Sequence, residues 1–156
     1  MQRSLRLPRR INHTKRKGEI KLKAAGTYGV KKWDENVEDQ VSPVMKMTRA
    51  SVEYTMSGEF NGKSVVEYLM FYKYYDANDQ HKSSAVYIGL MRFTGSVKGK
   101  EGSFAIEDHG TFENGEASSS LQIIAGSGMG ELKNIQGTGR YSATHDGAHI
   151  ELDYTL

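Results

Sequence analysis

Two acidic residues lie where the surrounding alternation places apolar side chains. Glu67 alternates with Leu69 and Phe71, and Asp108 alternates with Ile106. A carboxyl group drawn into an apolar face must find a hydrogen-bond partner, take up a proton or open onto a cavity. Strand alternation therefore predicts that both acids point into the fold.

Two interpretations of these acids remain open. In the functional one, burial raises the pKa of each carboxyl, which then serves as an acid or base, or donates a hydrogen bond to a ligand. In the structural one, each is bonded to a core tyrosine such as Tyr54 or Tyr87. His109 alternates outward unless a bulge at Asp108 turns it inward, and is a third candidate catalytic residue beside Glu67 and Asp108.

Other kinds of chemistry find little support. His145 and His149 are four residues apart, but a turn at Asp146-Gly147 points them to opposite faces, so we expect no metal site. The chain has no cysteine, which excludes thiol chemistry and disulfides. The glycines of residues 126–130 lack the third glycine of a dinucleotide loop and precede no predicted helix, so no cofactor is expected.

The glycines recur at strand spacing and mark hairpins. Two-residue turns are predicted at Asn61-Gly62, Asn114-Gly115 and Asp146-Gly147, because these residue pairs tolerate positive φ. The first turn sets Tyr54 opposite Leu69, and the third sets Tyr141 opposite Leu152. A four-residue loop over residues 98–101 sets Phe93 opposite Ile106.

These hairpins predict an all-β fold. With an opening strand from about Leu22 to Trp33 they give roughly eight strands in meander order, which most easily close into an antiparallel barrel. In a strand over residues 117–131, Leu121 and Ile123 require the odd-numbered positions to face inward, whereas the predicted pairing of residues 126–130 places even-numbered positions inward. We therefore expect a bulge near Ala125-Gly126.

Composition divides the chain into two parts. Of 156 residues, 17 are glycine and 2 are proline, which favours a β domain over a helical bundle. Residues 1–23 contain nine Lys or Arg and one Glu, whereas the rest of the chain is acidic. We expect residues 1–23 to be a disordered basic tail and residues 24–156 to be one domain. The basic run has no aromatic residues, so no nucleic-acid partner is expected, and no apolar stretch predicts export or a membrane span, which favours the cytoplasm.

Six ordered stretches carry a resemblance to a known family. They are Trp33-Asp34-Glu35, residues 48–52, residues 67–70, residues 89–95 without Met91, residues 109–112 and residues 126–132. In these stretches the chain resembles the mainly bacterial family called domain of unknown function 3224. The resemblance covers residue 26 to the end and implies a closed eight-stranded barrel of the allene oxide cyclase-like, calycin-like kind, without an established activity.

The sequence departs from the family pattern at two positions. Met91 stands where the resemblance implies an acid, and Asp108 stands where it implies glutamine. If Phe93 is paired with Ile106, then Met91 is paired with Asp108. The acid that the family pattern implies at position 91 then stands on the paired strand, at position 108.

The leading hypothesis is a small barrel that binds a small, largely apolar ligand in its lumen. The alternatives are an isomerase or cyclase that uses Glu67 or Asp108 as acid or base, and a filled barrel with a structural or interaction role. The expected ligand-binding residues are Tyr54, Glu67, Leu69, Phe71, Tyr87, Phe93, Asp108 and Tyr141.

A homodimer is the expected assembly. Tyr68, Met70, Tyr72 and Tyr74 alternate on a face predicted to point outward, which would expose more aromatic surface than a monomer normally leaves free. The alternative is that the basic tail or residues 34–43 cover this stripe.

Overall fold

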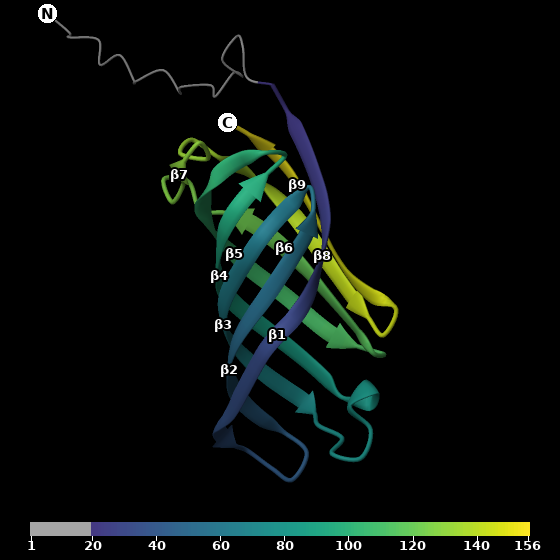
Figure 1. The fold of residues 1–156 in the computed structure, drawn as a ribbon. Coiled ribbons are helices and arrows are strands. Elements are labelled where there is room, and N and C mark those ends of the chain that lie inside the picture. Colours follow the sequence, from purple (N-terminus) through teal and green to yellow (C-terminus); the bar gives the residue numbers. More distant parts are fainter. Residues whose placement is uncertain (1–19) are drawn as a thin grey trace, which may run out of the picture.

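The computed structural model describes residues 20–156, which form one antiparallel sheet closed on itself (Figure 1). Its elements are β1 (Leu22–Gln40), β2 (Lys46–Gly58), β3 (Phe60–Tyr74), the 3₁₀ turn η1 (Gln80–Lys82), β4 (Ser84–Val97), β5 (Lys100–Glu113), β6 (Glu116–Ile123), β7 (Met129–Gly130), β8 (Gln136–Thr144) and β9 (Gly147–Thr155).

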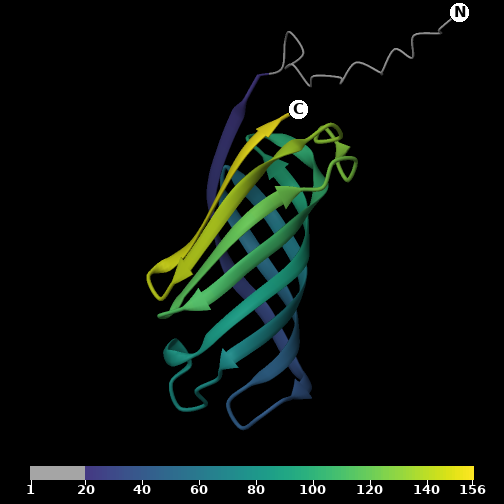
Figure 2. The ribbon, with the colours of Figure 1, turned by 180° about the vertical axis from the view of Figure 1, so that it is seen from behind.

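Eight strands form a ring. The order is β4-β3-β2-β1-β9-β8-β6-β5, and β4 pairs with β5 to close it, while the short β7 adds to β5. The view from behind shows β5, β6, β8 and β9 completing the wall (Figure 2). The predicted closed antiparallel fold of about eight strands is confirmed. Most of the expected tail, residues 1–19, lies outside the described residues, and β1 begins at Leu22. No helix within residues 20–156 has the length and apolar character needed to cross a membrane.

Three of the hairpins keep the predicted faces. Asn114-Gly115 forms the expected two-residue turn, with φ of 52° and 74°. The β4–β5 and β8–β9 hairpins are each shifted by two residues from the expected register, so that Phe93 opposes Phe104 and Tyr141 opposes Ile150. A shift of two leaves every side chain on its predicted face.

The β2–β3 hairpin departs from the prediction. The chain turns around Glu59 instead of at Asn61-Gly62, and Tyr54 opposes Ser64. Gly58 takes the left-handed conformation at φ 92°, and Phe60 is buried in the core. The register differs by five residues, an odd number, so every side chain of β3 lies on the face opposite to the one expected.

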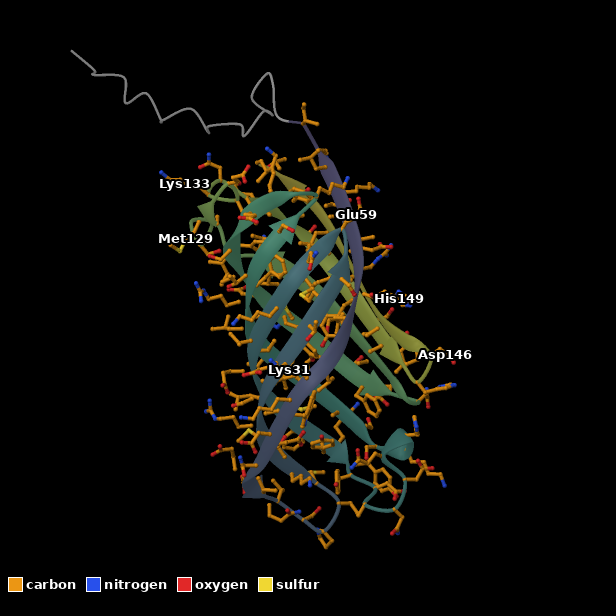
Figure 3. All side chains as sticks on the ribbon, in the orientation of Figure 1. Lys31, Glu59, Met129, Lys133, Asp146 and His149 are labelled. Atoms are coloured by element: carbon orange, nitrogen blue, oxygen red, sulfur yellow. The ribbon has the colours of Figure 1, made fainter. Side chains whose placement is uncertain are left out.

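The interior is solid at one end. Side chains with almost no exposed surface fill it: Phe60, Phe93, Val97, Phe104, Ile106, Ile123, Leu132, Ile135, Ile150 and Leu152. Leu132 and Ile135 come from residues 124–135, which form turns around the two-residue β7 where a bulged strand was expected. In Figure 3, Glu59, Met129 and Lys133 lie at this end, and Asp146 marks the tip of the β8–β9 hairpin, away from it.

Candidate functional site

The other part of the ring encloses a cavity of about 500 Å³. β1 pairs with β9 only from Leu22 to Thr27, whereas its pairing with β2 continues to Gln40. From this later part of β1, Tyr28, Val30 and Trp33 line the cavity. Seven Tyr, Trp and Phe side chains line it: Tyr28, Trp33, Tyr54, Tyr68, Tyr87, Phe112 and Tyr141. His81, Gly115, His145 and Gly147 also line it, from η1 and from the β5–β6 and β8–β9 turns.

Four tyrosine hydroxyls meet in one hydrogen-bonded cluster, which we call the tyrosine floor (Tyr54, Tyr68, Tyr87 and Tyr141). The Tyr68 hydroxyl lies 3.1 Å from that of Tyr54 and 3.3 Å from that of Tyr141. Tyr141 donates to the Tyr87 hydroxyl at 2.9 Å, and the hydroxyls of Tyr87 and Ser119 are 2.7 Å apart. These residues come from five different strands, so only the closed ring brings them together.

Asp108 lies behind the tyrosine floor and has no exposed surface. Tyr68 donates to its Oδ2 at 3.3 Å, whereas Oδ1 has no hydrogen-bond partner among the described residues. Burial raises the pKa of Asp108 to about 6, against the opposing effect of the Ser119, Tyr68 and Tyr141 hydroxyls. Burial also raises the pKa of Tyr68 and Tyr141, so these hydroxyls keep their protons at neutral pH.

Two glycines make room for the floor. Gly89 lies between Tyr68 and Asp108 in the sheet, and a Cβ on it would be 2.6 Å from Cδ1 of Tyr68. Gly110 lies between Tyr87 and Ser119, and a Cβ on it would overlap both hydroxyl groups. In each case the missing side chain lets a tyrosine reach a partner two strands away.

Trp33 stands at the exposed side of the cavity. Its ring stacks on Tyr68 at 6.3 Å between centroids and 26° between planes. Its Nε1 donates to Glu35 Oε1 at 3.0 Å, and the Tyr72 hydroxyl donates to Glu35 Oε2 at 2.9 Å. Glu35 therefore orients the indole over the tyrosine floor.

The predicted site residues fall into four groups: some line the cavity, one lies in the solid end, some lie on the outer face, and Asp108 lies behind the tyrosine floor. Tyr54, Tyr87 and Tyr141 line the cavity, in agreement with the predicted inward direction. Phe93 is buried, but it packs edge-on against Phe60 in the solid end and does not line the cavity.

Glu67, Leu69 and Phe71 were expected in the lumen, and this orientation is wrong. They lie on the outer face because the β2–β3 register differs by an odd number of residues. Glu67 accepts hydrogen bonds from the Ser51 hydroxyl at 2.8 and 2.9 Å, at an exposed position. The same shift turns Tyr68 and Met70 inward, so the outer stripe from which a homodimer was expected does not exist.

The inward direction of Asp108 is confirmed, but its expected neighbours are not. Gly89 opposes it in place of Met91, which pairs with Ile106. His109 is exposed on the outer face. Within residues 20–156, no group of three or more His, Asp or Glu side chains is arranged to hold a metal ion.

Sequence reasoning missed four residues of the site as functional candidates: Tyr28, Trp33, Tyr68 and Ser119. The hydroxyl of Tyr28 is buried without a partner among the described residues. Its ring packs edge-on against Tyr54 at 4.8 Å and against Tyr141 at 5.5 Å. Trp33 belongs to one of the stretches that resemble the family. For Tyr68 the signal is the alternation of inward and outward positions along the strand. Tyr68 points inward if β2 and β3 turn around Glu59, but the Asn61-Gly62 pair favours a turn that points it outward.

The arrangement suits binding more directly than catalysis. An aromatic wall contacts apolar surface, and a few hydroxyls at its base can bond one polar group. The Asp108 carboxyl does not line the cavity, so it acts on an occupant only through Tyr68.

Comparison with known proteins gives the family but no activity. The family model described as "Protein of unknown function (DUF3224)" matches residues 24–155. A crystal structure of a protein of unknown function from this family, from Shewanella oneidensis MR-1, is similar to the chain with a TM-score of 0.64 and 22% identity. The alignment covers 86% of this chain and 97% of that one. No curated protein matches the sequence.

Proposed function

The chain belongs to the DUF3224 family, and from its cavity we propose that it is a binding protein for a small, largely apolar molecule. The observation that carries this proposal is the cavity of about 500 Å³, whose size is that of ordinary ligand pockets. Its aromatic walls would contact an apolar ligand, and the tyrosine floor would fix the ligand's orientation.

The charge of the lining supports an uncharged ligand. Among the described residues that line the cavity there is no Lys, Arg, Asp or Glu. A strongly charged molecule would lose its hydration without gaining an ion pair, which is costly. Planar or compact apolar molecules avoid this cost.

Trp33 makes the proposal testable without a label, because it is the chain's single tryptophan and lines the cavity. We expect tert-butylbenzene to change the emission of Trp33 in a saturable way when the indole is excited selectively. Displacement of water from around the exposed indole is the physical reason.

A matched pair of variants locates the binding. Ala117 lines the cavity, whereas the next residue, Ser118, is exposed on the outer face of the same strand. Ala117→Phe fills part of the cavity and should weaken binding at least tenfold, while Ser118→Phe should leave it unchanged. A titration without saturation, or equal affinity in both variants, contradicts the proposal.

A further inference from the structure

A pair of tyrosine rings at the end of β3 holds the ammonium group of a lysine. Tyr72 and Tyr75 pack edge to face, with 5.2 Å between ring centroids and 84° between planes. The Nζ of Lys46 lies 3.4 Å from the ring centroid of Tyr75 and 5.6 Å from that of Tyr72. A cation within about 6 Å of a ring centroid is attracted by the negative face of the ring. The position of Nζ therefore marks one point at which a cation is attracted by both rings.

The rings have contacts that do not involve the lysine. The Tyr72 hydroxyl donates to Glu35 Oε2 at 2.9 Å, and the backbone N–H of Tyr75 donates to the Val44 carbonyl at 2.6 Å. Among residues 20–156, Lys46 takes part in no ion pair with a carboxylate. The two rings can therefore stay in place when the ammonium group leaves them.

Both rings line a second hollow, of about 470 Å³. Asp34 and Glu35 line it too, and Lys46 is the single basic side chain among the described residues of its wall. Neither Tyr75 nor Lys46 lines the larger cavity. Once the lysine ammonium is withdrawn, the second hollow carries two carboxylates and two aromatic rings without a positive charge. Such a surface favours an organic cation.

We propose that the second hollow is a binding site for a small molecule with a quaternary ammonium group, and that Lys46 occupies it until the ligand displaces it. A lysine ammonium is compact and strongly hydrated, so it gives up hydration when it rests on a ring. A quaternary ammonium carries the same charge with a weaker hydration shell, and its methyl groups contact the rings directly. The flexible lysine stem lets its head return to water.

Emptying the second hollow tests the proposal. Lys46→Met removes the charge and keeps an apolar stem, while Lys133→Met removes the same charge at an exposed position in the solid end (Figure 3). In calorimetric titrations with choline, Lys46→Met should bind about tenfold more tightly than wild type, and Lys133→Met should match wild type. Equal affinity in the three proteins, or no binding by Lys46→Met, contradicts the proposal.

A second pair of variants, made together with Lys46→Met, assigns the binding to the rings. Tyr75→Leu removes a ring that lies just beyond the end of β3, whereas Tyr75→Phe keeps it. The leucine variant should bind choline about tenfold more weakly, and the phenylalanine variant should retain the affinity. An unchanged affinity in Tyr75→Leu, or an equal loss in both variants, would show that the ring does not hold the cation.

A neutral analogue separates the charge from the shape. The compound 3,3-dimethylbutan-1-ol has the shape of choline without its charge, and its binding should not respond to Tyr75→Leu, because Tyr75 does not line the larger apolar cavity. If Tyr75→Leu weakens both compounds alike, the second hollow does not select a cation and the proposal is wrong. Failure of choline to bind leaves the function proposed above intact, because tert-butylbenzene tests a different cavity.

Discussion

Gly89 leaves open the space through which the ring of Tyr68 passes, since a Cβ on this glycine would lie 2.6 Å from Cδ1 of Tyr68. Gly89 is in ordinary strand conformation, so the reason for a glycine here is the close approach of a side chain and not the backbone. Gly89 and Gly110 both belong to the stretches that resemble the family. The tyrosine floor thus depends on residues that have no side chain.

Gly89→Ala should therefore displace Tyr68 from Asp108. We expect a loss of about 1–3 kcal/mol in the free energy of unfolding, which is typical of forcing one methyl group into a packed interior. Gly29→Ala is the matched control on β1, because a Cβ there meets nothing within 4 Å. Chemical denaturation of both variants measures the difference, and equal stability would show that Tyr68 can move without cost.

Asp108→Asn should change how stability depends on pH. The pKa of Asp108 rises from 3.8 to about 6 on folding, which corresponds to roughly 3 kcal/mol. Because the folded protein holds this proton more tightly, the contribution is fully present below pH 3.8 and is lost as the pH rises through 6. Wild type should thus lose stability relative to Asp108→Asn between pH 4 and pH 7.

Urea denaturation at a series of pH values measures this difference. Asp153→Asn, at an exposed carboxylate near Lys23, is the control and should change little. Parallel pH profiles for wild type and Asp108→Asn would mean that the carboxyl is not desolvated.

Glu67→Gln should leave ligand binding unchanged. The side chain is exposed on the outer face and bonds only to Ser51 among the described residues, so the stability should change by less than about 0.5 kcal/mol. The titration with tert-butylbenzene and a thermal melt check both expectations. Weaker binding would place Glu67 in the site after all.

The homodimer remains a prediction, and the structure moves it to another surface. The outer face of β3 and β4 carries a group of neighbouring exposed and half-buried apolar side chains beside Glu67: Leu69, Phe71, Val86, Ile88 and Leu90. We expect a second copy of the chain to cover this group, since a monomer rarely leaves so many neighbouring apolar side chains free.

Sedimentation velocity tests the dimer. Ile88→Lys should dissociate it, whereas Thr94→Lys, exposed on the same strand beyond this group, should not. A wild-type protein that stays monomeric at high concentration would contradict the prediction.

The fold was predictable because turn residues and alternation agree along most of the chain. At the β4–β5 and β8–β9 hairpins the error in register was two residues, which preserves faces, so the burial of Asp108 and Tyr141 followed correctly. At β3 the sequence is apolar on both faces, and the pattern alone could not choose between them. The favourable Asn61-Gly62 pair then selected the wrong turn.

The site was predictable only in part. Tyr54 and Tyr141 were expected inside, but their hydrogen bonds depend on where distant strands meet when the ring closes. Residues 124–135, which plug one end, could not be distinguished by sequence from a bulged strand. For that reason the division into a solid end and an open cavity emerged only from the structure.

The most direct measurement of the central claim is a crystal structure of the protein grown with tert-butylbenzene. We expect electron density for one probe molecule inside the ring, in contact with Trp33 and with the rings of Tyr54 and Tyr141. A cavity filled by ordered water, with the probe absent or bound only on the outer face, would contradict it.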